Sequence, residues 1–536
     1  MTSDIIVEIN SGCVRGLVKS SLLGDKYYSF QRIPYAKPPI GDLRFKAPVP
    51  IEPWNNTLDA TQEGPVPYYV ETHFEGLVTS EDCLHLNVYS KNIFERLPVI
   101  VFIYGGAFHS GSSTTKLYGP DYLMQKDVVL VTFNYRLGSL GFMHFDDPSL
   151  NIPGNAGLKD QLLVLKWIQE NIEKFGGDKN NVTLIGNSAG AGSVSLHLIS
   201  EASKNLFHRA ILMSGNAFCS WSIVPPNNFG LDLAKALDWN GEGGEREALI
   251  HLRTVHPEKL TEIGAKLLTQ EHYYQGFIFP FAPSIETYHS EACFINDHPK
   301  KLAKNAWSKN IDIIFGYTSN EGIMDARSTT FEMFKTLNDY QLFIPLDART
   351  GKSEATLMQE VKKIKNVYNN FSDVSQNNLQ SYFEFISDTR FIHGIHRNIL
   401  SRVNYKDDAL GKTYIYRFCY DFPTRNHHKI AFGGAGLPGA THADDLSYIF
   451  SNGWGPIPEK GTGEWNAVQK MVDLFTGFVI NGSKKLKELD WEEVQKDQLP
   501  YQYKCLEIND EWKMKIIPEI ERIKVWDAIY PEQELY

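Results

Sequence analysis

The chain has 536 residues, of which 42% are apolar and 22% are charged, a composition typical of a globular protein. Its 53 basic and 64 acidic residues give a net charge of −11, which disfavours nucleic acid and anionic membrane surfaces as partners. No stretch approaches the roughly 20 apolar residues that a membrane-spanning helix requires. We therefore expect neither a nucleic acid nor a membrane as a partner.

The N-terminal residues Met1 to Val14 have no basic stretch, and Asp4 and Glu8 interrupt the apolar run that a signal peptide needs. The six cysteines lie far apart and form no CxxC pair, which disfavours a zinc or redox site. In a reducing compartment such cysteines are free, buried thiols. We therefore predict a cytoplasmic protein that holds no metal.

The expected secondary structure begins with short alternating strands and a proline-rich stretch in residues 1–50, which predict a small antiparallel hairpin region. Further along, short apolar runs are typical of buried strands. The apolar spacing over Gly157–Phe175 predicts a helix that ends at the glycines after Phe175. The predicted strands are Leu97–Gly106, Asp127–Arg136, Val182–Gly186, Asp312–Gly316 and Tyr414–Phe418.

Buried strands that alternate with helices indicate an α/β fold with a mainly parallel central sheet and helices on both faces. The length alone would allow roughly three or four domains. No linker, repeat or low-complexity segment divides the chain, however. We therefore predict one domain over residues 1–536, with long insertions between its elements.

The first chemical motif is Gly186-Asn187-Ser188-Ala189-Gly190, a G-x-S-x-G pattern. Alone this pattern is weak, but here it follows a predicted strand and opens a helix rich in small residues. In that setting a serine sits in a strained turn with its hydroxyl exposed, as a nucleophile requires. Ser188 is therefore the predicted nucleophile.

A pair of glycines ends the first predicted strand in Tyr104-Gly105-Gly106-Ala107-Phe108. These glycines could simply form a turn, but they can also let backbone N–H groups point into a cleft, which is how an oxyanion hole is built. The N–H group of the residue after the nucleophile would be a further donor.

A nucleophilic serine needs a base, and the base needs a carboxylate that orients it; on this kind of fold the acid precedes the base in the chain. Glu321 follows a predicted strand in the loop GYTSNEG, and His442 lies in a glycine-rich loop before ADDLSYIF. A surface carboxylate and a solvated loop histidine are the alternatives at these positions. His393 and His396 fall in a helical pattern and are expected to be structural.

The loop before His442 also contains G-x-G-x-x-G at Gly434, Gly436 and Gly439. Neither a clear helix start nor an acidic residue follows at the spacing of a dinucleotide site, so we reject that interpretation. No P-loop, HExxH or EF-hand pattern occurs. We therefore predict that the protein needs no cofactor.

Long strings of the sequence carry a family resemblance. They are FQRIPYAKPPIGDLRFKAPVP (Phe30–Pro50), SEDCLHLNVYS (Ser80–Ser90), NYRLGSLGF (Asn134–Phe142), PGNAGLKDQ (Pro153–Gln161), FGGDKNNVTLIGNSAGAGS (Phe175–Ser193), MSGNAFCSW (Met213–Trp221), GYTSNEG (Gly316–Gly322) and THADDLSYIF (Thr441–Phe450). With them the chain resembles the type-B carboxylesterase/cholinesterase family, most closely the insect α-esterases. The resemblance covers essentially the whole chain and implies the α/β-hydrolase fold.

The resemblance also implies roles for individual residues. Ser188 would be the nucleophile, Glu321 the acid and His442 the base. The implied oxyanion-hole donors are Gly106, Ala107 and Ala189, and the implied acyl pocket is lined by Trp221, Phe277 and Phe279. Two implied structural ion pairs are Arg44 with Glu81 and Arg136 with Asp160.

The sequence departs from the family pattern at several positions. Ala107 stands where glycine is common; alanine keeps the N–H group, but its methyl narrows the pocket beside it. Asn187 stands where cholinesterases have glutamate, and His73 lies roughly where they have a choline-binding tryptophan. Without that carboxylate and ring a quaternary ammonium loses its partners, so the chain is not expected to be a cholinesterase. No cysteine lies between Cys13 and Cys83, although secreted relatives have one there that pairs with the second.

The predicted function is a serine carboxylesterase that hydrolyses short-acyl and xenobiotic esters through an acyl-enzyme on Ser188. It would also sequester organophosphates, which implies a role in detoxification and insecticide resistance. The alternatives are a xenobiotic-binding protein with slow turnover, and an esterase for an endogenous hormone, pheromone or lipid ester. A catalytically inactive binding protein and a serine peptidase fit the motifs less well. The partners would be small ester substrates and organophosphate inhibitors, and the protein would be a monomer or a homodimer.

Overall fold

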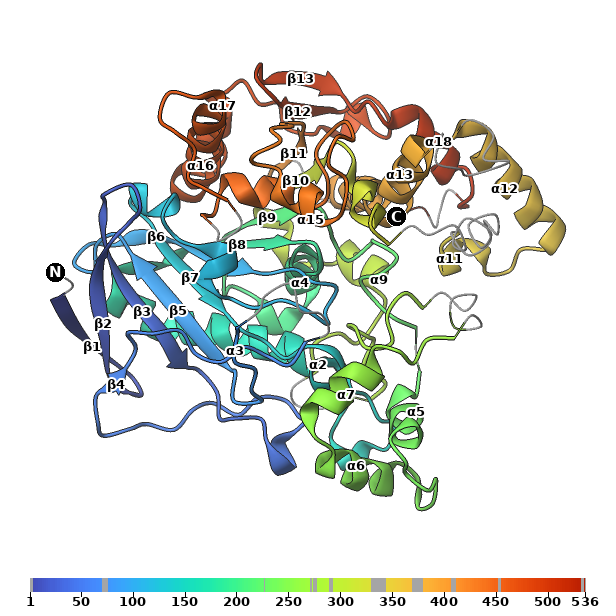
Figure 1. The fold of residues 1–536 in the computed structure, drawn as a ribbon. Helices are drawn as coiled ribbons and strands as arrows, with labels where there is room; N and C mark the ends of the chain where they lie inside the picture. Colours follow the sequence, from blue (N-terminus) through green and yellow to red (C-terminus); the bar gives the residue numbers. More distant parts are fainter. Residues whose placement is uncertain are drawn as a thin grey trace.

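The computed structural model describes residues 3–69, 76–225, 227–269, 272, 277–288, 293–328, 344–368, 379–405, 411–451, 455–531 and 535. A 13-stranded sheet runs through the molecule in the order β1-β2-β3-β5-β7-β6-β8-β9-β10-β11-β12-β13, and β4 pairs with β2 (Figure 1). The strands are β1 (Ser3–Ile9), β2 (Gly12–Ser20), β3 (Lys26–Pro34), β4 (Leu58–Asp59), β5 (His85–Ser90), β6 (Leu97–Ile103), β7 (Val129–Phe133), β8 (Gly177–Asn187), β9 (Arg209–Met213), β10 (Asp312–Thr318), β11 (Thr413–Phe418), β12 (Lys504–Ile508) and β13 (Lys513–Ile516).

The direction of the strands changes along the sheet. The N-terminal strands β1, β2, β3 and β5 pair antiparallel, which confirms the predicted hairpin region. From β7 to β12 the neighbours pair parallel, and β13 adds an antiparallel strand at the far edge. The mainly parallel centre of the predicted α/β-hydrolase fold is therefore confirmed.

The central strands are buried on both faces. Every residue of β7 is buried, as is nearly every residue of β6, so side chains pointing to either side of the sheet are covered. Helices pack around the sheet, and both α4 and α16 contact β6 and β8. The helices are α1 (Thr115–Tyr118), α2 (Gly138–Phe142), α3 (Ala156–Asn171), α4 (Ala189–Ile199), α5 (Phe229–Ala236), α6 (Gly244–Thr254), α7 (Pro257–Gly264), α9 (Pro299–Lys304), α11 (Leu346–Arg349), α12 (Glu354–Val367), α13 (Leu379–Ser387), α14 (His393–Asn404), α15 (His427–Ala431), α16 (Gly463–Asn481), α17 (Ser483–Lys487) and α18 (Ile520–Asp527).

The predicted helix over Gly157–Phe175 corresponds to α3 and a following 3-10 turn. It ends at Gly176, whose φ of +78° lies in the left-handed region that favours glycine. β8 begins at Gly177, five residues before the predicted start. The polar residues in between are partly solvated, so they carry no apolar signal, yet Gly177 already pairs with Leu97 of β6.

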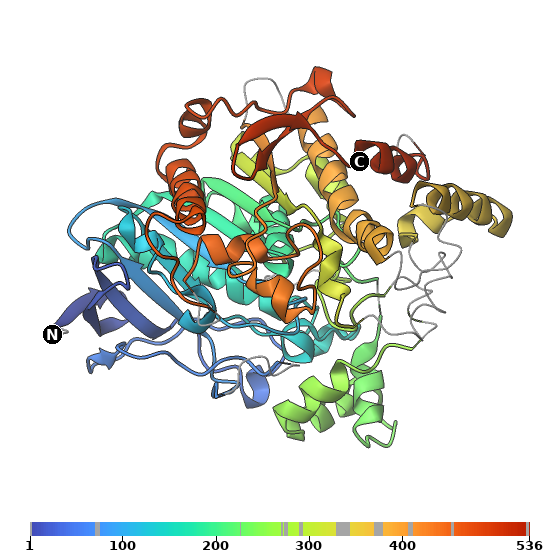
Figure 2. The same cartoon turned by 45° about the horizontal axis from the view of Figure 1, so that its top comes forward.

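The predicted insertions lie around the sheet. α5, α6 and α7 form a group at one end of the molecule, and the C-terminal helix α18 lies beside α12 (Figures 1 and 2). Apolar residues of the first group share a hydrophobic cluster with Phe108, Ala189 and Trp221. This insertion therefore packs over the same core as the predicted site.

Both implied ion pairs are present and confirmed. Arg44 Nε lies 2.7 Å from Glu81 Oε1, and Arg136 Nε lies 2.8 Å from Asp160 Oδ2. Asp160 is fully buried, and burial raises its pKa although Arg136 opposes the change.

All six cysteines are free, as predicted. The expectation of burial was wrong for half of them, because the strand ends and loops that carry them reach the surface. Cys83, Cys219 and Cys505 are buried, whereas Cys13, Cys293 and Cys419 are partly exposed.

Candidate active site

Ser188 occupies a sharp turn between β8 and α4. β8 ends at Asn187, α4 begins at Ala189, and Ser188 has φ 56° and ψ −124°. A non-glycine residue in this region is strained, and such strain concentrates at functional sites. The Ser188 N–H group donates to Met213 O, at the end of β9, at 2.8 Å. The elbow predicted from the G-x-S-x-G motif is therefore present.

The two glycines of the motif are required by close packing. A Cβ atom added to Gly190 would lie 2.0 Å from Ile103 O, the last carbonyl of β6. A Cβ atom added to Gly186 would lie 2.3 Å from Gly190 O. Only glycine lets the strand, the turn and the helix approach so closely.

Glu321 and His442 lie together next to the carboxyl end of β10. His442 Nδ1 lies 2.6 Å from Glu321 Oε2, and both side chains are buried. The other carboxylate oxygen, Oε1, accepts the Thr318 N–H at 2.7 Å and the Ser214 hydroxyl at 2.6 Å. The alternatives of a surface carboxylate and a solvated histidine are excluded by this contact.

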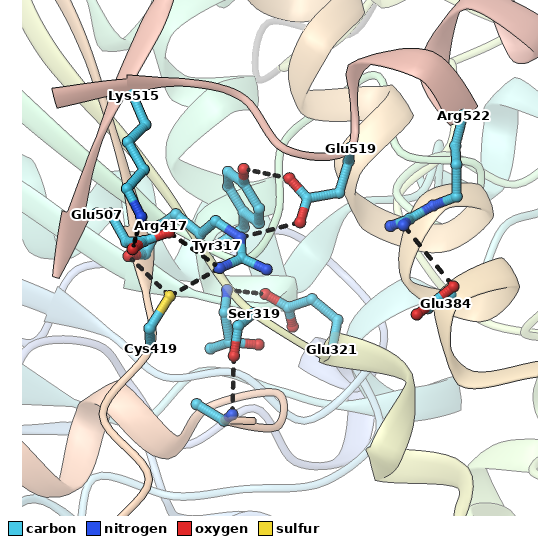
Figure 3. A network of polar contacts seen from close by, with 12 residues as sticks. Tyr317, Ser319, Glu321, Glu384, Arg417, Cys419, Glu507, Lys515, Glu519 and Arg522 are labelled. Atoms are coloured by element: carbon cyan, nitrogen blue, oxygen red, sulfur yellow. Dashed lines mark hydrogen bonds and ion pairs between the residues drawn. The ribbon is translucent and has the colours of Figure 1, made fainter. Parts of the chain in front are cut away.

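The loops that carry this acid–histidine pair are held by a polar network (Figure 3). Ser319 Oγ accepts the Ala440 N–H at 2.9 Å, which ties the histidine loop to the end of β10. On the same strand, the Tyr317 hydroxyl donates to Glu519 Oε2 at 2.8 Å, and Arg417 Nε donates to Glu519 Oε1 at 2.9 Å. Glu519 thus joins β10 to its neighbour β11.

Ser188 is the third residue of the predicted triad. Within the described part of the chain, its Oγ forms no hydrogen bond with His442. A bond between nucleophile and base is often long before substrate binds. The missing bond therefore does not argue against Ser188 as nucleophile or His442 as base. Phe391 packs on the histidine ring with the centroids 4.6 Å apart. Nothing local in the sequence distinguishes Phe391 from other helix residues.

The predicted oxyanion hole falls on the loop after β6, which has consecutive residues with positive φ. Gly106 has φ +119°, and Ala107 has φ +56°. Gly106 O accepts the backbone N–H groups of His109 and Ser110 at 3.0 and 2.9 Å, which folds the loop into a tight turn. Ala189 is the first residue of α4, where an N–H group has no partner within its own helix.

The predicted acyl-pocket residues have different surroundings. Trp221 lies beside the elbow, because a Cβ atom added to Gly215 would lie 2.9 Å from Trp221 Cη2 and 2.5 Å from Ser188 O. Phe279 packs edge-on against His109, just after the oxyanion loop, with the ring centroids 5.5 Å apart. Phe277 is buried and packs against Phe229 at 5.2 Å.

Two buried carboxyl groups follow His442 and were also missed. Asp445 receives the Tyr416 hydroxyl at 2.8 Å, while its Oδ1 has no hydrogen-bond partner in the described structure. Burial raises the pKa of Asp445 to about 7, and the nearby charge of Glu321 adds to the shift. Burial also raises the pKa of Asp444 to about 8. The only local signal was the acidic pair itself.

The remaining candidates lie elsewhere or in structural roles. His393 and His396 lie on α14 and are buried; each Nε2 contacts a carboxylate oxygen of Asp527 at 3.0 Å, which fits the expected structural role. His73 lies outside the described residues, and Asn187 is buried at the end of β8. The described residues contain no cluster of histidine, cysteine and acidic side chains that could hold a metal ion. Among them there is also no helix long and apolar enough to span a membrane.

Comparisons with known proteins define the class of the molecule. The sequence profile of the carboxylesterase family matches residues 3–526. The chain is 42% identical to Esterase B1 of Culex pipiens over 99% of both chains, and 32% identical to a juvenile hormone esterase of Tribolium castaneum over 98% of this chain and 92% of that one. The crystal structure of juvenile hormone esterase from Manduca sexta, with OTFP covalently attached, aligns with a TM-score of 0.84 at 29% identity and covers 98% of this chain and 100% of that one.

A G-x-S-x-G elbow on an α/β-hydrolase fold, with a buried acid–histidine pair at the same edge of the sheet, defines a serine hydrolase. The chain belongs to the carboxylesterase family, and it is an enzyme that hydrolyses carboxylic esters.

Proposed function

We propose that this carboxylesterase cleaves esters with short acyl groups, including xenobiotic esters, with Ser188 as nucleophile. The observation that carries the proposal is the 2.6 Å contact between His442 Nδ1 and Glu321 Oε2. An ionised carboxylate only accepts hydrogen bonds, so Nδ1 carries the proton and Nε2 is free to act as a base.

The reaction then proceeds in two halves. His442 takes the proton of Ser188 as its oxygen attacks the ester carbonyl, and the N–H groups of Gly106, Ala107 and Ala189 hold the developing oxyanion. Losing one such donor typically costs about 3–4 kcal/mol of transition-state stabilisation. His442 protonates the departing alcohol, and water cleaves the acyl-enzyme by the same route. Trp221, Phe277 and Phe279 supply bulky rings that favour acetyl to butyryl groups.

The direct test replaces the nucleophile. Ser188→Ala should abolish hydrolysis of a nitrophenyl butyrate while leaving the melting curve unchanged, because only the oxyanion hole and substrate binding would remain. Turnover above about a hundredth of the wild-type rate would refute the assignment of Ser188. A higher kcat/KM for a myristoyl than for a butyryl ester of the same alcohol would refute the short-acyl pocket.

Organophosphates should be trapped on Ser188. A tetrahedral phosphoryl group resembles the tetrahedral intermediate, so the oxyanion donors assist its attachment. Release needs a water activated on the far side of phosphorus, and the side chains of Gly106 and Ala107 offer no base. Mass spectrometry after mixing with a diethyl phosphate ester should show an adduct on the peptide with Ser188 and about one product per enzyme. Rapid multiple turnover without an adduct would contradict sequestration.

A second candidate is hydrolysis of a hormone ester. It is favoured by the similarity to the juvenile hormone esterases of Tribolium castaneum and Manduca sexta. A kcat/KM for juvenile hormone above that for butyryl esters would support this candidate over the first. We also propose that the protein is cytoplasmic, which the free cysteines support and cell fractionation tests. We propose further that it is a monomer or a homodimer, which sedimentation velocity tests.

A further inference from the structure

Between α13 and α14 the backbone forms a π-helical turn over Asp388–Ile392. The His393 N–H group donates to Asp388 O, five residues earlier, instead of the four of an α-helix. Such a turn accommodates one extra residue within a helix and is frequent at functional sites. This turn therefore re-aims the side chains and carbonyl groups of a helix that would otherwise run straight from Leu379 to Asn404.

The re-aimed groups reach the active site. Arg390 O accepts the indole N–H of Trp221 at 2.7 Å, and the Phe391 ring lies on His442. Phe391 and Trp221 also pack on each other, with centroids 6.0 Å apart. Two consecutive residues of the turn thus form an aromatic wall of the site, made of Trp221 and Phe391: Arg390 O holds the Trp221 ring, and the next residue supplies the second ring.

This wall has little room to move on its far side. A Cβ atom added to Gly394 would lie 2.8 Å from Cys219 Sγ, so α14 and the loop that carries Trp221 are in close contact. On the other side the Trp221 ring lies against Gly215, next to Ser188. The position of the π-helical turn consequently sets the position of the Trp221 ring relative to the nucleophile.

The side chain of Arg390 connects the π-helical turn to the 3-10 turn that begins at Glu321. Arg390 Nη1 lies 3.1 Å from Asp325 Oδ2, and the same carboxylate receives the Tyr382 hydroxyl at 3.2 Å. Asp325 is buried, with 8% of its surface exposed, and it ends the 3-10 turn that Glu321 begins. One ion pair therefore joins the segment of the proposed acid to the segment of the aromatic wall.

We infer that the Arg390–Asp325 ion pair is a specificity-determining device: it positions the π-helical turn, and through it Trp221 and Phe391, so that the site accepts short acyl groups and rejects long ones. The inference rests on the proposed function. Both residues act through the wall, so they are positioning residues and touch no reacting atom. A pocket that rejects one extra methylene discriminates by about tenfold or more, provided that its wall does not yield.

The test removes both charges at once, since a lone buried carboxylate would destabilise the fold. The double variant Arg390→Met/Asp325→Asn is compared with wild type on nitrophenyl esters from acetyl to decanoyl. The ratio of kcat/KM for octanoyl over butyryl ester should rise about tenfold. The single variant Arg390→Lys keeps a cation opposite Asp325 and should retain the wild-type ratio. If the double variant does not fold, Tyr382→Phe loosens the same carboxylate and should shift the ratio in the same direction.

A matched control removes a comparable ion pair away from the site. Lys91 Nζ lies 2.8 Å from Asp25 Oδ1, and Lys91 follows Ser90, which pairs with the first residue of β7 at the opposite end of the parallel strands. Lys91→Met/Asp25→Asn should leave the acyl-length ratio unchanged. The inference would be overturned if the ratio in Arg390→Met/Asp325→Asn stayed within about twofold of wild type, or if the control variant shifted the ratio equally.

The same experiment separates this inference from the proposed function. Hydrolysis by the wild type that is lost in Ser188→Ala supports the proposed serine mechanism whatever acyl-length ratio the ion-pair variants show. Hydrolysis that survives in Ser188→Ala refutes the proposed function directly. In a double-mutant cycle, Trp221→Phe and the paired change Arg390→Met/Asp325→Asn should alter the ratio less than additively, because both act through the hydrogen bond between the Trp221 indole and Arg390 O. Full additivity would contradict the proposed route through Trp221.

Discussion

Replacing Glu321 with glutamine tests the acid–histidine pair most directly. Two hydrogen-bond donors face Oε1, the Ser214 hydroxyl at 2.6 Å and the Thr318 N–H at 2.7 Å. The oxygen of a glutamine amide must therefore stay at the Oε1 position, because an NH₂ group there would face two donors. The NH₂ group then replaces Oε2, opposite His442 Nδ1.

This placement reverses the histidine tautomer. The amide donates to Nδ1, so the imidazole proton moves to Nε2, which can no longer accept the proton of Ser188. We expect kcat to fall about 10⁴-fold, which corresponds to about 5.5 kcal/mol of barrier. The fold should persist, because Ser214 and Thr318 keep their acceptor.

The assay is pre-steady-state hydrolysis of nitrophenyl butyrate, with thermal melting measured in parallel. Glu384→Gln is the matched control: Glu384 is a partly exposed glutamate 3.7 Å from Arg522, to one side of Glu321 (Figure 3). It should retain wild-type turnover. If Glu321→Gln kept more than about a tenth of the wild-type kcat with an unchanged melting curve, the tautomer argument would be refuted.

Other perturbations probe the elbow, a buried ion pair and a titrating carboxyl group. Gly190→Ala places a methyl 2.0 Å from Ile103 O and should lower the free energy of unfolding by about 1–3 kcal/mol, which urea titration measures. Arg136→Leu leaves Asp160 buried without its partner and should cost about 3–5 kcal/mol, much of which Asp160→Leu should recover when added. Because burial raises the pKa of Asp445 to about 7, this group binds a proton in the folded state but not in the unfolded state from about pH 4 to 7. The stabilisation from this proton is fully present below about pH 4 and is lost as the pH rises to 7. The free energy of unfolding should therefore fall by up to about 1.4 kcal/mol per pH unit in this range, and Asp445→Asn should remove that slope.

The parts of the site that were predictable are those with local causes. Ser188 was found because a strand, a tight turn and a helix leave a sequence pattern of small residues around one serine. Glu321 and His442 were found because each follows a predicted strand or precedes a recognisable string, in the chain order that the fold imposes. The central strands were found because burial on both faces requires continuous apolar runs.

The π-helical turn was not predictable from the sequence, because its causes are distant in the chain. Leu379 to Asn404 has the periodicity of one continuous helix. The turn is held by ion pairs at its first and third residues: Asp388 with Arg522 at 2.6 Å, and Arg390 with Asp325. The two partners lie 134 and 65 residues away in sequence. Phe391 reaches the site only as a consequence of that tertiary arrangement.

The strained residues of the site share one structural origin. Ser188 and Ser214 both have positive φ, which costs about 1–3 kcal/mol each, and each directly follows the last residue of a strand. Hydrogen bonds of the sheet extend just beyond those ends: Ser188 N–H donates to Met213 O, and Ser214 N–H donates to Gly316 O, both at 2.8 Å. The buried sheet thereby fixes the first residue of each loop against its neighbouring strand. Strain can persist there because relaxing either residue would require breaking its hydrogen bond to the neighbouring strand. These bonds therefore fix the position of Ser188 relative to Ser214, whose hydroxyl contacts Glu321.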